Sequence, residues 1–179
     1  MVKDNHLDSQ DRILNYVKKH SASFARISRI VEMANSERDN TAAYYTRQDI
    51  CFGIVNNLPD AKNYSTISIL EPSIGVGNFL PSLIEKYSTV PNVSIDVVDI
   101  NPSSLELLEE MLKHISIPDN FNIRFIEGDF LLLNFDKRYD IVIGNPPYMK
   151  LTKDKALASQ YKANAVNKDT NNILSLIHI

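Results

Sequence analysis

The sequence predicts an α/β fold in which helices flank a layered, parallel sheet. Two observations support this prediction. Short β-rich runs alternate with longer helical segments after residue 65, and strands joined by such segments pair in parallel. Each of these runs also ends in a polar or glycine-rich stretch, at the edge where open α/β sheets bind ligands. A chain of 179 residues, 44% of them hydrophobic, is long enough for one domain with a proper core.

The first part of the chain predicts helices. Apolar residues recur at three- and four-residue spacing between Asp11 and Ala34, which is typical of one or two amphipathic helices. We expect residues 1–40 to form an N-terminal helical segment. A shorter helix is expected from Gln48 to Leu58, where Pro59 stops it.

The remaining elements follow in alternation. Helices are expected over residues 78–87 and 103–115, the second opened by a capping pair of Ser103 and Glu106. Strands are expected over residues 66–70, 93–98, 123–126 and 139–143.

Composition excludes several classes of protein. The formal net charge of −3 argues against this chain alone being a strong binder of nucleic acid, because phosphate binding rests on clustered Lys and Arg. The single Cys51 excludes an internal disulfide, and four scattered histidines offer no zinc spacing, so we expect no metal. The polar start of the chain and the lack of a long apolar run predict a cytoplasmic protein without a membrane span.

The first predicted strand ends in Glu71-Pro72-Ser73, followed by Gly75 and Gly77. Glycines permit backbone conformations and close approaches that a Cβ would block, and the next helix offers free backbone donors at its start. This pattern favours a cofactor loop. Taken alone it is equally typical of a tight turn between a strand and a helix.

Acidic residues end the next two strands. Asp99, followed by Ile100, lies where an acid can accept hydrogen bonds from both hydroxyls of a ribose, although a capping or solvated acid is an equal alternative. Asp129 and Phe130 pair an acceptor for an amine with a ring that can lie on a base. The structural alternative for this pair is a turn acid beside a core phenylalanine.

The fourth strand runs directly into Asn145-Pro146-Pro147-Tyr148. Proline lacks a backbone donor and biases the preceding residue toward extended geometry, so the strand must stop there. Asn145 and Tyr148 are then presented at the carboxyl end of the strand, where an amide and an aromatic ring are suited to hold a flat, polar group.

Taken together, these motifs resemble the amino-group branch of class I S-adenosylmethionine-dependent methyltransferases, and most closely the adenine-specific DNA methyltransferases of restriction-modification systems. The family's nucleotide loop is similar to EPSIGVGNFL, its ribose acid to Asp99 in VVDINP, its adenine acid to Asp129 in EGDFL, and its catalytic tetrapeptide to NPPY. Ala43-Tyr44-Tyr45-Thr46 resembles a cofactor-contacting motif that precedes the loop, with Arg47 where the family has proline. The resemblance spans residues 41–148.

The resemblance implies a Rossmann-like class I fold, S-adenosylmethionine as cofactor, and methyl transfer to the exocyclic N6 of an adenine flipped out of duplex DNA. The implied catalytic residues are Asn145, Pro146, Pro147 and Tyr148. The implied cofactor-binding residues are Tyr45, Thr46, Glu71, Pro72, Ser73, Gly75, Gly77, Asp99, Ile100, Asp129, Phe130 and Asn145.

The resemblance also implies partners. In the relatives a target-recognition domain follows the catalytic domain and supplies most of the basic surface, so we expect double-stranded DNA to be bound through a domain that this chain lacks. A restriction endonuclease subunit or fusion is a candidate partner. We expect a catalytic domain over residues 41–173, incomplete at its C-terminus, and an artificial tail over residues 174–179. The lysine-rich segment 150–168 either approaches phosphates or is a solvated loop.

Two alternatives stay open from the sequence. A release-factor glutamine N5-methyltransferase shares NPPY, because a side-chain amide is an equally poor nucleophile, although the Glu-Pro-Ser opening of the loop and Tyr44-Tyr45-Thr46 favour DNA. The other alternative is an inactive module that binds cofactor or a partner subunit.

Overall fold

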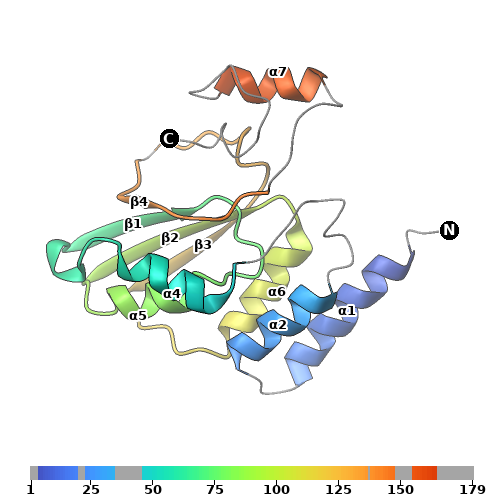
Figure 1. Cartoon of the computed structure of the whole chain (residues 1–179), viewed down its shortest axis with the longest axis horizontal. Coiled ribbons are helices and arrows are strands. Elements are labelled where there is room, and N and C mark those ends of the chain that lie inside the picture. Colours follow the sequence, from blue (N-terminus) through green and yellow to red (C-terminus); the bar gives the residue numbers. More distant parts are fainter. Residues whose placement is uncertain (1–3, 20–22, 35–45, 137, 148–154, 165–179) are drawn as a thin grey trace.

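The computed structural model describes residues 4–19, 23–34, 46–136, 138–147 and 155–164 (Figure 1). Its helices are α1 (Asp4–Lys19), α2 (Phe24–Ala34), α4 (Gln48–Asn56), the 3-10 turn η1 (Ala61–Asn63), α5 (Leu80–Tyr87), α6 (Pro102–Leu112) and α7 (Lys155–Asn164). Its strands are β1 (Thr66–Glu71), β2 (Asn92–Asp99), β3 (Phe121–Glu127) and β4 (Ile141–Val142). Of the helices in this described part, none has the length and apolar character that crossing a membrane requires.

The strands form one sheet in the order β3-β2-β1-β4, with every neighbouring pair parallel. The predicted parallel sheet is confirmed. Because every neighbouring pair is parallel, the carboxyl ends of the strands lie along one edge. Ile69 of β1 lies in the middle of the sheet, where it pairs with Ile95 of β2 on one side and with Ile141 of β4 on the other.

The core lies between the sheet and the helices on one of its faces. Alternate residues of β1 and β2, such as Ile67, Ile69 and Ile95, are fully buried and point toward α5 and α6. Leu83 of α5 and Leu108 of α6 are equally buried in the same cluster. Figure 1 shows α4, α5 and α6 on this side of the sheet and α7 beyond β4 on the other side.

The two N-terminal helices pack into this same core. Val17 of α1 and Ile27 of α2 are fully buried in it, and an ion pair of 3.5 Å joins Lys18 to Glu106 of α6. The helices predicted for the segment are confirmed, with α1 beginning at Asp4 rather than at Asp11. The boundaries of the catalytic domain stay predictions, and residues 174–179 lie outside the described residues.

Two predicted helix starts are wrong, since α5 begins at Leu80 rather than at Asn78 and α6 begins before Ser103. Helix α6 begins at Pro102, and its N-cap is Asn101, whose side chain accepts a hydrogen bond of 3.0 Å from the Ser103 N–H. Proline favours the first helical position because its φ is already helical and that position needs no donor. The helix therefore starts one residue before Ser103, which receives no capping role.

Strand β4 is shorter than predicted, although the Asp140 N–H and the Ile143 N–H still donate to the Ser68 and Leu70 carbonyls of β1, each at 2.9 Å. Side chains also hold the residues in front of it. The Tyr139 hydroxyl donates to Asp96 Oδ2 at 2.5 Å, and Asp96 also accepts two hydrogen bonds from Arg124, at 2.7 and 3.1 Å. Next along the chain, Asp140 Oδ2 accepts from both the Ser68 N–H and its hydroxyl at 2.8 Å. These contacts fix the approach to β4 and so its position beside β1.

We expect Arg124→Ala to lower the free energy of unfolding, because the carboxyl group of Asp96, which is 2% exposed, would lose two hydrogen bonds and a facing positive charge. Arg124 is itself more than half exposed, so the expected loss is about 1–3 kcal/mol rather than the larger cost of breaking a fully buried pair. Urea denaturation measures the change. Lys113→Ala, which removes an exposed ion pair with Glu110, is the control and should leave the transition in place; an equal shift in both variants would contradict the anchoring role.

Candidate active site at the carboxyl edge of the sheet

Backbone hydrogen bonds bring the ends of the four strands together. The Ile74 N–H donates to the Val98 carbonyl at 2.9 Å, and the Gly128 N–H donates to the Asp99 carbonyl at 3.0 Å. On the other side of β1, the Ile143 N–H donates to the Leu70 carbonyl at 2.9 Å. The segments that follow the four strands therefore start from neighbouring points of one edge.

The loop after β1 depends on its glycines. Gly75 has a φ of 54° and Gly77 a φ of 71°, both in the left-handed region that favours glycine. A Cβ on Gly77 would lie 2.6 Å from Cδ1 of Leu108, which is fully buried and cannot move aside freely. Within this loop the Gly75 N–H donates to Asp99 Oδ2 at 3.0 Å, so the loop folds over the end of β2.

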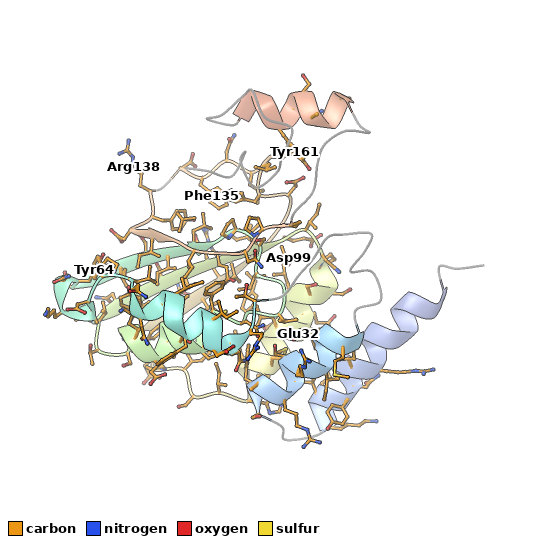
Figure 2. The ribbon with its side chains drawn as sticks, in the orientation of Figure 1. Glu32, Tyr64, Asp99, Phe135, Arg138 and Tyr161 are labelled. Atoms are coloured by element: carbon orange, nitrogen blue, oxygen red, sulfur yellow. The ribbon has the colours of Figure 1, made fainter. Side chains whose placement is uncertain are left out.

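Asp99 keeps acceptor capacity beyond these bonds. Its Oδ1 accepts from the Asn101 N–H at 2.9 Å, and each carboxylate oxygen can accept a further hydrogen bond. Burial raises the pKa of Asp99, while the hydrogen bonds from the backbone of Asn101 and Gly75 act in the opposite direction. The carboxyl group lies close to the centre of the view in Figure 2.

Glu71 is the most unusual group at this edge. It is 2% exposed, and its Oε2 has no hydrogen-bond partner among the described residues. Burial raises the pKa of Glu71 well above its ordinary value, and the negative charge of Asp99 raises it further. The buried hydroxyl of Ser73 also lacks a partner within the described ranges. Such orphaned acceptors indicate a place where a ligand supplies the donors.

Asp129 connects β3 to helix α7. Its Oδ1 accepts from the Leu131 N–H at 3.0 Å, and its Oδ2 accepts from the hydroxyl of Tyr161, which is 6% exposed. Figure 2 shows Tyr161 directed from α7 toward the sheet. The neighbouring Phe130 ring is half-buried and lies 5.6 Å from the Phe135 ring, centroid to centroid.

The segment after β4 abuts the glycine loop. A Cβ built on Gly144 would lie 3.1 Å from Cδ of Pro72 and 3.7 Å from the Ser73 hydroxyl. Gly144, the residue before NPPY, therefore lies against Pro72 and Ser73. Of the residues that follow it, Asn145 and Pro147 are half-buried and Pro146 is buried.

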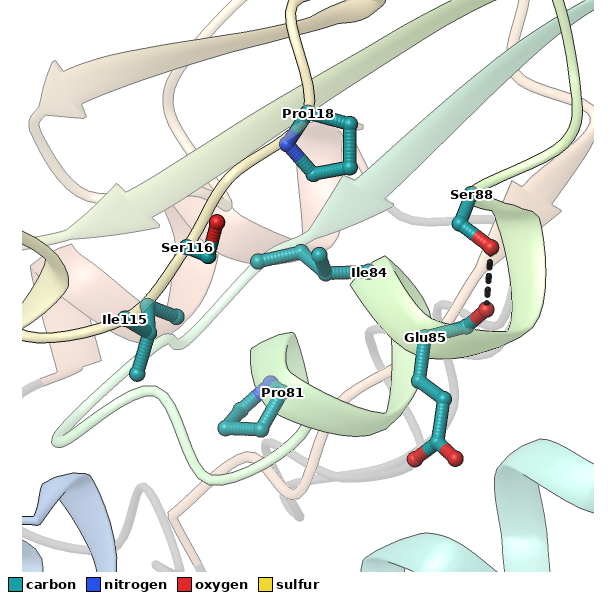
Figure 3. Close-up of a pocket in the computed structure, with 7 residues that line it drawn as sticks. All are labelled: Pro81, Ile84, Glu85, Ser88, Ile115, Ser116 and Pro118. Carbon is teal, nitrogen blue, oxygen red and sulfur yellow. Dashed lines mark hydrogen bonds between the residues drawn. The ribbon is translucent and has the colours of Figure 1, made fainter.

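A separate hollow of about 270 Å³ lies at the opposite edge of the sheet (Figure 3). It is lined by Pro81, Ile84, Glu85, Ser88, Ile115, Ser116 and Pro118. None of these is a predicted site residue. In the described part of the chain, no group of three or more His, Cys, Asp or Glu side chains is arranged to hold a metal ion.

Residues 93–177 match the family described as Eco57I restriction-modification methylase. The type II methyltransferase M.VspI of Vibrio sp. (strain 343) is 28% identical over 96% of this chain and 43% of its own length. The type II methyltransferase M.CvrRI of Paramecium bursaria Chlorella virus XZ-6E is 30% identical over 65% of this chain and 27% of its own length. These matches support a methyltransferase of the restriction-modification type.

The fold agrees with this family. A crystal structure described as a class I S-adenosylmethionine-dependent methyltransferase from Listeria monocytogenes superposes with a TM-score of 0.53, at 17% identity, over 79% of this chain and 43% of the other. The predicted class I methyltransferase fold is confirmed. The methylase chain spans less than half the length of these two curated relatives, and these matches do not favour either alternative reading.

The structure brings most of the predicted site residues of the methylase to one edge. Ile100 lies beside them but is 69% exposed. Thr46 is tied to the glycine loop, since its carbonyl accepts a hydrogen bond of 2.8 Å from the Asn78 side chain. Tyr45 and Tyr148 lie outside the described residues. All the roles assigned to these residues stay predictions.

Two residues at the edge were missed by the sequence reading. Tyr161 contacts Asp129 from a segment whose only sequence signal was its lysines, and those gave no reason to expect a buried hydroxyl. Asn78 follows the second glycine and is buried with a fully bonded side chain. Its signal was a polar residue between the second glycine and the apolar start of α5.

We expect the free energy of unfolding to depend on pH through Glu71. Above its ordinary pKa of 4.5 the unfolded chain gives up a proton that the folded protein retains, so stability falls as pH rises until Glu71 ionises in the folded state. The parent protein should lose stability between about pH 5 and about pH 8. In Glu71→Gln this loss should be smaller by at least about 1 kcal/mol.

Urea denaturation at the two pH values measures this difference. Glu85→Gln, a change to an exposed glutamate of α5, is the matched control and should keep the dependence of the parent protein. The same dependence in the parent and in Glu71→Gln would show that Glu71 does not titrate as its burial requires.

Proposed function

We propose that this methylase transfers the methyl group of S-adenosylmethionine to the exocyclic N6 of an adenine in duplex DNA. The observation that carries the proposal is that Gly144, the residue directly before NPPY, lies against Pro72 and Ser73 at the start of the glycine loop. A site that moves a methyl group must hold donor and acceptor side by side, and these two motifs are the predicted holders of each.

The hydrogen-bond acceptors at this edge of the sheet match the donors that S-adenosylmethionine carries. Glu71 Oε2 and the Ser73 hydroxyl are buried without a partner among the described residues, and Asp99 retains unused lone pairs. Ribose hydroxyls and an ammonium group are donors that match them, and a positive charge offsets the cost of two buried acids side by side. When bound, the cofactor supplies an electrophilic methyl group on a sulfonium centre.

Asn145 and Pro146 take the proposed role toward the base. The lone pair of an exocyclic amine is delocalised into the ring, which makes the amine a poor nucleophile. Two acceptors, the Asn145 side-chain oxygen and the Pro146 carbonyl, can hold both N–H bonds so that the lone pair is directed away from the ring plane. Both acceptors are neutral, so neither has to titrate, and the site works by alignment in a water-poor surround.

Tyr148 takes the proposed role of stacking on the flipped base, and such stacking is worth about 1–3 kcal/mol. Asp129 and Phe130 are the proposed contacts to the adenine of the cofactor. With a net charge of −3, this chain needs basic surface from another domain or subunit to hold duplex DNA. A target-recognition domain and a restriction endonuclease are the partners that we propose.

We expect Asn145→Ala to slow methyl transfer by about 10²-fold or more, because one of two acceptors on the amine is lost. Cofactor affinity should change little. Tritium transfer from labelled S-adenosylmethionine to duplex DNA, with the protein expressed from the complete gene, measures the rate, and calorimetry measures the affinity.

Asn122→Ala, a change to an exposed amide at the start of β3, is the control and should match the parent in both measurements. Loss of cofactor binding together with transfer in Asn145→Ala would contradict the assigned role. Transfer to a release factor rather than to DNA would replace the proposed substrate with a protein glutamine.

A further inference from the structure

A buried amide ties the glycine loop to the N-terminal helices. Asn78 is 5% exposed, and its Oδ1 accepts a hydrogen bond of 2.6 Å from the hydroxyl of Ser28 on α2. Its Nδ2 donates both hydrogens, one to Glu32 Oε1 at 3.0 Å and one to the Thr46 carbonyl at 2.8 Å. One side chain therefore connects α2, the residue two positions before α4 and the glycine loop.

Three side chains of the network are buried. Asn78, Ser28 and Glu32 are 5%, 1% and 8% exposed, and the remaining oxygen of Glu32 accepts from the exposed Arg29 at 3.2 Å. Polar groups at this depth cost free energy unless they are bonded, so Asn78 and its three partners hold one another in a single arrangement.

The loop is held at both ends as a result. Asn78 follows Gly77, whose left-handed backbone turns the chain, and at the other end the Gly75 N–H is bonded to Asp99. Thr46, a predicted cofactor contact, is fixed by the same amide. Loss of the Asn78 bonds would release the loop on one side and Thr46 on the other.

We propose that Asn78 is a positioning residue for cofactor binding, and that Ser28 and Glu32 of α2 complete the site by holding it. The inference rests on the proposed function, because it concerns the affinity for S-adenosylmethionine. It gives the N-terminal helices a part in the site that neither the motifs nor the family match assigns, since the match begins at residue 93.

The chemistry requires an amide at this position. Asparagine offers one acceptor to Ser28 and two donors to Glu32 and Thr46, which no other side chain of its size can do. In Asn78→Asp the donors become acceptors that face a carboxylate and a carbonyl. We expect this variant to bind S-adenosylmethionine about tenfold or more weakly at about pH 7.5, because fewer molecules hold the loop in the binding arrangement.

Two readouts separate positioning from a general loss of structure. Lower pH lets the two facing carboxyl groups share a proton, so the ratio of the variant's dissociation constant to that of the parent should fall on acidification. The Glu32→Gln/Asn78→Asp double variant exchanges the amide and the carboxylate, which restores a donor and an acceptor between the two positions. It should recover part of the lost affinity.

Calorimetric titration of the full chain with S-adenosylmethionine, alongside thermal unfolding of each variant, tests the inference. Asn57→Asp makes the same change at an exposed amide of the α4 C-terminus and should bind as the parent does. Equal affinity in the parent and in Asn78→Asp, or no recovery in the double variant, would overturn the positioning role.

If Asn78→Asp shows no cooperative unfolding, then Ser28→Ala and Glu32→Ala decide the question, since each removes one partner of the same amide. Both should weaken binding, and unchanged affinity in both would overturn the inference. A parent chain that does not bind the cofactor would contradict the proposed function itself, which is a different result.

Discussion

The hydrogen bond from the Gly75 N–H to Asp99 Oδ2 is the contact on which the site depends. It joins the segment after β1 to the end of β2, and it forms only because Gly75 and Gly77 adopt left-handed backbone conformations that side chains disfavour. The parallel register pairs Glu71 with Val97, so Asp99 extends two residues beyond the end of β1, and the loop folds back over it. Gly144, arriving from β4, meets Pro72 and Ser73 of this closed loop.

The same closure places two acidic side chains where there is little water. Burial raises the pKa of both Glu71 and Asp99, and the charge of Asp99 acts further on Glu71. A fold gains nothing in stability from two crowded acids, one of which has an oxygen without a partner among the described residues. Such an arrangement is typical of a binding site, where a ligand with donors and positive charge removes the cost. The exposed ion pairs of the helices carry no such implication, because solvent screens them.

Much of the fold could be predicted from the sequence, because alternating β-rich and helical runs leave few arrangements other than a parallel sheet. Short-range details were harder to predict. Pro102 moved the start of α6 ahead of Ser103, although Pro102 and its neighbour Asn101, the N-cap, are both visible in the sequence. The partners of Asp140 and Tyr139 in front of β4 are Ser68 and Asp96, and these are known only once the chain is folded.

Some residues of the candidate site could likewise be predicted from the sequence, and others could not. The motifs at the strand ends are local in sequence, so Glu71, Asp99, Asp129 and Asn145 could be named before the fold was known. Asn78 and Tyr161 could not be assigned, because their partners are 50 and 32 positions away along the chain. The roles of these residues in chemistry rest on the family and on the proposals above.

The most direct test is a crystal structure of the chain grown with S-adenosylhomocysteine, the demethylated form of the proposed cofactor. The account predicts a nucleoside at the carboxyl edge of the sheet, with its ribose hydroxyls within hydrogen-bond distance of Asp99 and the rest of the molecule along the Gly75 to Gly77 loop. A ligand bound elsewhere, such as in the hollow beside Pro81 and Pro118, or crystals that never take up the ligand, would contradict it.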